Sequence, residues 1–404
     1  MKRSAVIVSE YASDNLGDQA ICRSLKGILS PYFDIKLLIF SGLGQPVSVR
    51  PLFPTEPKPS VLRRLSRIVP PKIKARVRWY LLGEQKQYEK DCMHSIKGST
   101  FVFIGGGQLI KNNISLFCDR LLTLNKITRK HNIPCALVGV GVDRKMNMLT
   151  WQLVSDLIKN SCFVAVRDNL SRQRIHDNLK HTDECHVLPD LAFALENPAL
   201  KCKNEPRKIS IGINVMGINT LLGSMGKETR VDATSIIQKY CQIFEYALEM
   251  DSSYRLFTSG SADDLQEANI IRLAIFEETG IEVSVFHPES LDDLLEFLAG
   301  VRDVFAARMH VGILAYISGC NPVCINWDDK VRGVWSAVGQ EDRVIELATL
   351  ADDTFSADLF EKLRHLTPPS RGDLVELADI VRTGVAREVV GFLDHNERTG
   401  ALVG

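Results

Sequence analysis

Buried strands and amphipathic helices alternate along most of the chain. Short runs of apolar, β-branched residues are each followed by a small polar loop, and then by a segment whose apolar positions recur at helical spacing. This alternation predicts parallel sheets covered by helices on both faces. In the first half the predicted strands are residues 5–11, 35–40, 100–104, 135–142 and 163–166, and the predicted helices are 18–29 and 149–159.

The same pattern restarts after residues 198–207, a polar, proline-containing segment that we interpret as a linker. The predicted strands of the second half are residues 209–215, 254–258, 282–286, 303–307 and 322–327, and its helices are 234–250, 263–279, 291–298 and 311–318. Two consecutive open α/β units predict two Rossmann-like domains that face a cleft, with ligands at the carboxyl ends of the strands.

The domain boundaries that we predict are residues 1–197, residues 198–370 and a C-terminal segment, 371–404, whose amphipathic helix packs across the domains. A length of 404 residues suits two α/β domains of ordinary size. The formal net charge is zero, so nothing global points to nucleic acid.

The cysteines and the hydropathy pattern predict a cytoplasmic protein. Ten cysteines are present, mostly single residues inside apolar runs, which is typical of reduced core cysteines. The apolar run at residues 4–9 is too short for a signal peptide, and no stretch approaches the roughly 20 apolar residues of a membrane span.

One basic segment departs from the α/β pattern. Residues 58–90 hold ten basic and two acidic residues, and they include an apolar Trp79-Tyr80-Leu81-Leu82 run. One interpretation is a solvated helical insertion. The other is a flap that contacts anionic lipid or a lipid-linked diphosphate at the inner face of the membrane.

Polar or glycine-rich sequences follow two of the first predicted strands. Asn15-Leu16-Gly17-Asp18 offers either helix capping or an anion site at a helix N-terminus, and the spacing alone favours capping. Gly105-Gly106-Gly107 would allow a ligand to approach the backbone closely.

Cationic residues follow three later strands. Arg167-Asp168 ends one strand, and either a surface ion pair or a ligand-binding arginine explains it. Arg308 and His310 end another strand, where extended backbone would place both on one face, and Lys330 follows the next strand. An arginine, a histidine and a lysine at neighbouring strand ends would bind a small dianion, with bidentate contacts from the arginine and a proton from the histidine.

These motifs occur in a recognisable order: Asn15-Leu16-Gly17-Asp18, Phe103-Ile104-Gly105-Gly106-Gly107, Val138-Gly139-Val140-Gly141, Val166-Arg167-Asp168, Pro189-Asp190, Arg308-Met309-His310, Gly319-Cys320-Asn321-Pro322-Val323 and Lys330. Together they resemble the polysaccharide pyruvyl transferase family, over nearly the whole chain. The sequence has Met309 where the family commonly has leucine, and Asp168 where glutamate is frequent.

The resemblance implies a fold similar to GT-B glycosyltransferases, with the acceptor on the N-terminal side and the donor on the C-terminal side. It also implies phosphoenolpyruvate as donor and a sugar, free or lipid-linked, as acceptor in polysaccharide or cell-surface glycan biosynthesis. Arg167, Arg308 and Lys330 would bind the donor, and His310 would act as general acid. Asn15 and the glycines 105–107 would belong to the acceptor side or its loops.

The implied reaction needs a base for the sugar hydroxyl, for which Asp18 and Asp190 are the candidates. It needs no metal and no cofactor, because phosphoenolpyruvate is a co-substrate.

Two other interpretations remain open. One is a GT-B glycosyltransferase that uses a nucleotide sugar, with Glu289 as a candidate for holding a ribose or sugar hydroxyl. The other is a protein without enzymatic activity that binds polysaccharide or a biosynthetic partner. The presence of Arg308, His310 and Lys330 together argues against the second.

Overall fold

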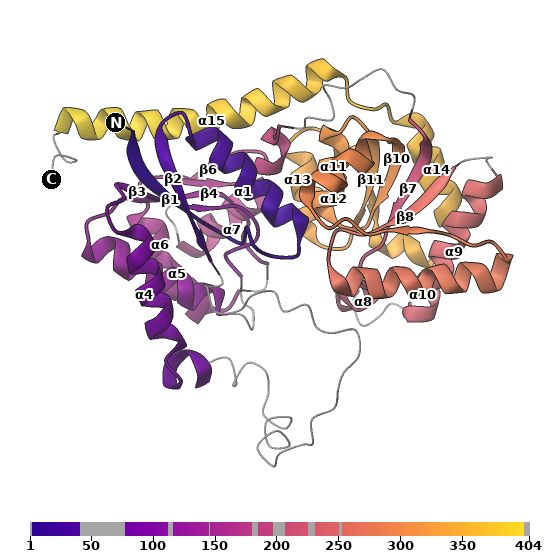
Figure 1. Cartoon of the computed structure of the whole chain (residues 1–404), viewed down its shortest axis with the longest axis horizontal. Coiled ribbons are helices and arrows are strands. Elements are labelled where there is room, and N and C mark those ends of the chain that lie inside the picture. Colours follow the sequence, from indigo (N-terminus) through magenta and orange to yellow (C-terminus); the bar gives the residue numbers. More distant parts are fainter. Residues whose placement is uncertain are drawn as a thin grey trace, which may run out of the picture.

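The computed structural model describes residues 2–40, 77–111, 116–144, 146–179, 185–196, 207–224, 231–249 and 253–399. These residues form two six-stranded sheets, each covered by helices, which lie side by side in Figure 1. The strand orders are β2-β1-β3-β4-β5-β6 and β12-β11-β10-β7-β8-β9. Every pair of neighbouring strands is parallel, as the alternating pattern predicts.

The first sheet occupies the N-terminal half. Its strands are β1 (Arg3–Ser9), β2 (Phe33–Ile39), β3 (Phe101–Gly105), β4 (Cys135–Val140), β5 (Val164–Val166) and β6 (Cys185–Val187). Its helices are α1 (Leu16–Leu29), α4 (Glu84–Ile96), α5 (Phe117–Lys130), α6 (Met148–Asn160) and α7 (Asn169–Leu179), followed by the short helix η1 (Leu191–Ala194).

The second sheet occupies the C-terminal half. Its strands are β7 (Ile209–Asn214), β8 (Tyr254–Phe257), β9 (Val285–Phe286), β10 (Val301–Ala306), β11 (Asn321–Asn326) and β12 (Val344–Glu346). Its helices are α8 (Ile218–Ser224), α9 (Ala233–Glu249), α10 (Ala262–Thr279), α11 (Leu291–Ala299), α12 (Met309–Ile317), α13 (Asp329–Ser336) and α14 (Phe355–His365).

The last helix, α15 (Arg371–Thr399), follows the second half but packs against α1 and η1 of the first. Figure 1 shows it running across the molecule towards the C-terminus. Arg382 donates to the carbonyl of Ala194 at 3.2 Å, and Glu388 lies 3.4 Å from His186. The predicted boundary between residues 197 and 198, and nearly all of the predicted linker, fall outside the described residues.

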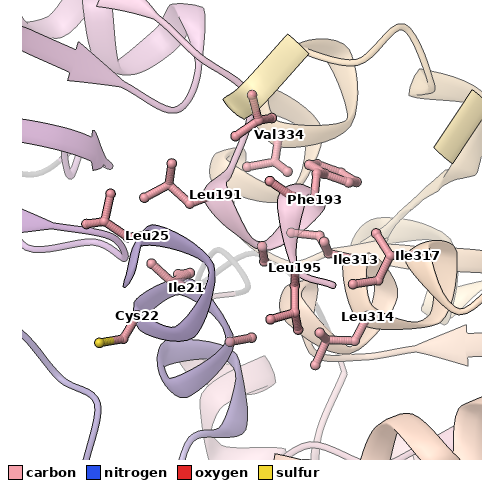
Figure 2. Close-up of a cluster of buried hydrophobic side chains, with 14 of the residues drawn as sticks. Ile21, Cys22, Leu25, Leu191, Phe193, Leu195, Ile313, Leu314, Ile317 and Val334 are labelled. Carbon is pink, nitrogen blue, oxygen red and sulfur yellow. The ribbon is translucent and has the colours of Figure 1, made fainter. Parts of the chain in front are cut away.

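An apolar core joins the two halves. Figure 2 shows η1 lying between α1 of the first half and α12 and α13 of the second. Phe193 is 1% exposed and its ring meets that of Trp335 edge-on at 5.9 Å. A large apolar interface of this kind fixes the relative position of two domains.

The basic segment is described only in part, because residues 58–76 lie outside the described chain. Residues 77–81 form a helical turn that leaves Leu81 and Leu82 77% and 71% exposed. Among the described residues, no helix combines the length and apolar composition that a membrane crossing requires.

Candidate active site

A cavity of about 150 Å³ opens between the two halves. Its walls follow β1, β3 and β5 in the first half and β8, β10 and β11 in the second, which is the edge where parallel sheets bind ligands. The lining residues are Asn15, Leu16, Gly17, Asp18, Gln108, Lys111, Arg167, Ser259, Leu294, Arg308, Met309, His310, Val311, Leu314, Trp327 and Lys330. The cavity thus brings together Asn15, Asp18, Arg167, Arg308, His310 and Lys330 of the residues that the sequence predicted for the site, but not Asp190 or Glu289.

Two larger hollows, of about 750 and 580 Å³, lie along α15 and away from the strand ends. The small cavity differs from them in its charge. Among the described residues that line it, four are lysine or arginine, one is His310 and one, Asp18, is acidic. We therefore place the candidate active site in the small cavity.

Arg308 is held by a buried carboxylate. Its Nε and Nη2 donate to the two carboxylate oxygens of Asp264 at 3.0 and 2.6 Å, and Asp264 is fully buried. The Ser259 hydroxyl and the Gly217 N–H also donate to Asp264, while the Arg308 N–H donates to Asn214. We expected the Arg308 guanidinium to bind a ligand with two nitrogens. Because Nε and Nη2 already bind Asp264, Nη1 is left for the cavity.

The prediction that extended backbone places Arg308 and His310 on one face of a strand was wrong. Arg308 is extended, with φ −92° and ψ 127°, but α12 begins at Met309, so His310 belongs to the first helical turn. Both side chains reach the cavity because the N-terminus of α12 is directed into it. Strand alternation does not bring them together.

His310 is inserted between elements of the first half. Gly17 packs directly against its ring, because a Cβ on Gly17 would lie 2.4 Å from Cβ, Cγ and Nδ1 of His310. On the other side, Nε2 lies 3.7 Å from Oδ2 of Asp190. The imidazole is therefore fixed by contacts across the domain junction.

Arg167 forms part of the cavity wall with a side chain only 2% exposed. Its guanidinium lies 3.4 Å from a carboxylate oxygen of Asp168 and 3.7 Å from one of Asp190. Gly141 makes room for it, since a Cβ there would lie 2.7 Å from Cζ. The Arg–Asp pair is thus buried, and the alternative of a surface pair is excluded.

Asp190 contacts both Arg167 and His310 and does not line the cavity. Burial alone would raise the pKa of Asp190, but His310, Arg167 and the N–H of Ala192 outweigh it and lower the pKa below 3.8. The carboxylate is fully buried and is not among the cavity-lining residues. Asp190 is therefore unsuited to the role of base that the sequence left open for it.

Asp18 and Asn15 lie at the start of α1. Asn15 caps the helix by accepting from the N–H of Gly17 at 3.1 Å, which confirms the capping interpretation. Oδ2 of Asp18 accepts from Asn15 at 3.1 Å and from Ser13 at 3.3 Å. Oδ1 of Asp18 has no hydrogen-bond partner in the described part of the chain, and so it can accept a proton from a ligand.

Lys330 projects into the cavity from the first turn of α13. Its Nζ donates to Oε1 of Gln108 at 3.3 Å and lies 4.1 Å from the ring centroid of Trp327. Burial, together with the nearby cations Arg167 and Arg308, lowers the pKa of Lys330 to about 8.

Two arginines of the first half hold α13 in place. Arg144 and Arg174 both lie 3.4 Å from Oδ2 of Asp329, the residue before Lys330. Lys330 therefore comes from the second half, but contacts with the first half position it.

Gly105 and Gly106 serve packing, Gly107 lies next to Oδ1 of Asp18, and none of the three lines the cavity. A Cβ on Gly105 or Gly106 would lie 2.2 or 1.7 Å from Leu25 or Ile21 of α1. Gly106 and Gly107 also have φ of 76° and 73°, which favour glycine. The turn that they make carries Gln108 and Lys111 to the cavity, and this is the contribution of the glycine run to the site.

Sequence reasoning missed Lys111, Gln108 and Asp264. Burial lowers the pKa of Lys111, and its Nζ lies 4.1 Å from the ring centroid of Phe117. The signal that could have found Lys111 is its position a few residues after a glycine-rich strand end. Asp264 likewise follows the end of β8, in a Ser-Gly-Ser-Ala-Asp-Asp sequence.

The geometry suits a small, multiply charged anion. The positive ends of α1, α12 and α13 meet at the cavity, because Leu16, Met309 and Lys330 of their first turns all line it. Cationic side chains surround the same space. Asp18 is placed to accept a proton beside this anion site.

Comparison with solved structures identifies the fold. UDP-GlcNAc 2-epimerase from Neisseria meningitidis, bound to UDP-GlcNAc, matches with a TM-score of 0.54 and 10% identity over 97% of this chain and 100% of that one. The enzyme of the same name from Methanocaldococcus jannaschii matches with a TM-score of 0.53 and 12% identity, over 96% and 99%. α,α-Trehalose 6-phosphate synthase from Burkholderia multivorans matches with a TM-score of 0.54 and 11% identity, over 99% of this chain and 98% of that one.

At these identities the likeness establishes the GT-B fold alone. The comparison with curated proteins gives no match. The family model of polysaccharide pyruvyl transferases matches residues 15–329, a span that runs from the cap of α1 to the start of α13 and so contains nearly every residue of the cavity. The chain therefore belongs to the polysaccharide pyruvyl transferase family.

Proposed function

We propose that the protein transfers the pyruvyl group of phosphoenolpyruvate to two hydroxyls of a sugar and forms a ketal, in the biosynthesis of a polysaccharide or cell-surface glycan. The observation that carries this proposal is the convergence of four lysine or arginine side chains, His310 and three helix N-termini on one cavity of about 150 Å³. Phosphoenolpyruvate is compact, carries a carboxylate and a phosphate, and needs this density of positive charge.

Arg308 binds the donor carboxylate through Nη1, while Asp264 fixes the orientation of its guanidinium. Lys330 binds the phosphate, and Arg167 adds a fixed positive charge to the cavity wall. Arg167 is 2% exposed and its Nε lies 3.4 Å from Oδ2 of Asp168, so this carboxylate holds the charge in place at the cavity wall.

The chemistry needs one proton donor and one acceptor. The first sugar hydroxyl forms a bond to C2 of the enol, C3 takes a proton from His310, and Asp18 accepts the hydroxyl proton. The second hydroxyl then bonds to C2 as the bond from C2 to the phosphate oxygen breaks. The second hydroxyl proton leaves with inorganic phosphate, whose charge the surrounding cations stabilise.

The nucleotide-sugar alternative is less well supported. Glu289, its candidate for holding a ribose or sugar hydroxyl, is exposed and is not among the residues that line the cavity. A volume of about 150 Å³ is also small for a nucleotide sugar, since pockets for drug-sized ligands are typically about 300 to 1,000 Å³.

We further propose that the protein contacts a membrane through the basic segment 58–90, of which residues 77–90 are described. Leu81 and Leu82 support this contact, because two exposed leucines beside a strongly basic sequence favour an anionic lipid surface. Replacing both by serine should reduce co-sedimentation with vesicles that contain phosphatidylglycerol. Unchanged co-sedimentation would exclude these leucines from the contact.

Ligand-induced thermal stabilisation separates the two donor classes. Phosphoenolpyruvate should raise the melting temperature of the wild-type protein, and uridine diphosphate should not. Arg308→Ala should lose the shift, whereas His310→Ala should keep it, because His310 acts in catalysis more than in binding. Stabilisation by uridine diphosphate without stabilisation by phosphoenolpyruvate would favour the nucleotide-sugar alternative.

A further inference from the structure

We infer that Lys111 is a ligand of the donor phosphate, which it binds from the first half of the molecule, opposite Lys330 of the second half. The inference rests on the proposed function, because it assumes a phosphate-bearing donor in the cavity. It assigns Lys111 a role that the motifs in the sequence do not indicate.

The charge balance of the cavity distinguishes the lysines from the arginines. Asp264 compensates Arg308, and the buried carboxylates of Asp168 and Asp190 compensate Arg167. In the described parts of the chain, no carboxylate oxygen lies within 4.0 Å of Nζ of either Lys111 or Lys330. Acidic groups act on the lysines only at longer range, Asp18 and Glu10 on Lys111 and Asp328 on Lys330, so both ammonium groups remain available for a direct contact with a ligand.

The two lysines also have the same kind of environment. Nζ of Lys111 lies 4.1 Å from the ring centroid of Phe117, and Nζ of Lys330 lies 4.1 Å from that of Trp327. Burial lowers the pKa of both ammonium groups, and a bound dianion would stabilise their charged forms. The phosphate carries more charge than the carboxylate and so suits the two available ammonium groups, while the compensated Arg308 suits the carboxylate.

Backbone contacts fix the position of Lys111. The preceding residue, Ile110, pairs with Val142 in a parallel bridge, and its carbonyl accepts from the N–H of Asp143 at 2.8 Å. The carbonyl of Gly107 accepts from the N–H of Gly141 at 2.9 Å. This loop therefore presents Lys111 at a defined place in the cavity.

Calorimetric titration of the full chain at pH 7 with inorganic phosphate and with phosphoenolpyruvate tests the inference. Lys111→Met should weaken both ligands by about tenfold to a hundredfold, the usual effect of losing a charged hydrogen bond. Lys126→Met, which removes an exposed lysine of α5, is the matched control and should change neither affinity. Arg308→Ala should weaken phosphoenolpyruvate and leave inorganic phosphate nearly unchanged.

A second variant keeps the charge of Lys111 and removes only the ring beneath it. Phe117→Leu should weaken phosphate binding by a smaller factor than Lys111→Met, because Nζ loses its aromatic contact. If Lys111→Met does not fold, Lys111→Gln and Phe117→Leu provide the same comparison.

Three results would overturn the inference. An unchanged phosphate affinity in both Lys111→Met and Phe117→Leu would exclude Lys111 from the phosphate site. The proposed function would still stand in that case if Lys330→Met weakened the binding of phosphoenolpyruvate. An equal loss of phosphate affinity in Arg308→Ala would show a general effect of charge and not a phosphate subsite. A wild-type protein that binds no phosphoenolpyruvate would overturn the proposed function as well.

Discussion

At the scale of single residues, the candidate site depends on glycines that leave room for Arg167 and His310. Gly17 lies against the His310 ring, and Gly141 lies against the Arg167 guanidinium, each at a distance that excludes a Cβ. Asp190 lies near both of these side chains and also helps to hold them. The positions of the charged groups therefore depend on residues that themselves do no chemistry.

Gly17→Ala should disturb the position of His310. The new Cβ would lie 2.4 Å from three atoms of His310 and must displace the ring. A misplacement of about 1 Å can cost about a hundredfold in rate, so we expect kcat to fall by at least about tenfold, together with a loss of stability of about 1 to 3 kcal/mol from overpacking. Gly27→Ala in the same helix meets no atom within 4 Å and should keep full activity; equal rates in the two variants would contradict the packing argument.

The pH dependence of donor binding should report on Lys330. Its pKa in the free protein is about 8, lowered from 10.5, so the ammonium loses its proton as the pH rises through about 8. Only the charged form attracts the donor, so kcat/KM for phosphoenolpyruvate should fall as the pH rises above about 8. In Lys330→Met, kcat/KM should be lower at every pH and should no longer fall above about pH 8. If kcat/KM of this variant still falls above about pH 8 as in the wild-type protein, another group causes the decrease.

The sequence predicted the cationic residues that follow strands, namely Arg167, Arg308 and Lys330, because strand ends share one edge of a parallel sheet. It could not predict Asp264 as the partner of Arg308. That contact joins positions 44 residues apart, and only the relative placement of α10 and α12 decides it. Lys111 was missed because its position shortly after a glycine-rich strand end indicates a loop near the site but does not show whether the lysine is buried or exposed.

At the scale of elements, the turn after β3 connects packing with ligand binding. Gly106 fits against α1, and the same turn then directs Gln108 and Lys111 towards the second half. A glycine run after a strand therefore acts here by shaping the loop, although the run itself does not touch the cavity. Substitutions in this glycine run should therefore affect ligand binding only by moving Gln108 and Lys111.

Gly106→Ala tests this role against a matched control. Both Gly106 and Gly98 have positive φ, of 76° and 74°, but a Cβ on Gly106 would lie 1.7 Å from Ile21 and one on Gly98 would meet nothing within 4 Å. Gly98→Ala should cost about 1 to 2 kcal/mol from backbone strain, and Gly106→Ala about 1 to 3 kcal/mol more from overpacking. Urea unfolding measures both, and equal costs would show that the packing against α1 is unimportant.

Elements with clear start and stop signals, such as α10 between Ser261 and Gly280, were predicted well, and elements without such signals or with few residues were not. The helix predicted at residues 263–279 corresponds to α10 (Ala262–Thr279), and the strand at 209–215 to β7 (Ile209–Asn214). α5 was missed because no side chain caps its start and Leu116 has a φ of 56°. β6 and β12 have three residues each, too few to show a period.

At the scale of the whole molecule, the two halves share one apolar core. η1 of the first half is buried against α12 and α13 (Figure 2), and α15 also packs against η1. This core holds His310 against Gly17 and Asp190. The candidate site is therefore already assembled in this structure, and we expect ligand binding to need little rearrangement of the domains.

Phe193→Ala should lower the stability of both halves of the molecule together. Removing a fully buried phenylalanine typically costs about 3 to 5 kcal/mol, and this one contacts Trp335 of the other half. The wild-type protein should unfold in one calorimetric transition, which the variant shifts to a lower temperature. The control variant Phe276→Ala removes a ring that is 52% exposed and should change the transition temperature little. Two separate transitions in the wild-type protein would contradict a shared core.

The central claim is pyruvyl transfer from phosphoenolpyruvate in the cavity between the halves. Its most direct test is the release of inorganic phosphate from phosphoenolpyruvate by the purified protein, with a panel of free and lipid-linked sugars as acceptors. We predict release that depends on the acceptor, a pyruvate ketal on the product, and a loss of at least about a hundredfold in His310→Ala, the usual size of a general acid's contribution. A rate in His310→Ala close to that of the wild-type protein would contradict the assignment of this cavity as the active site.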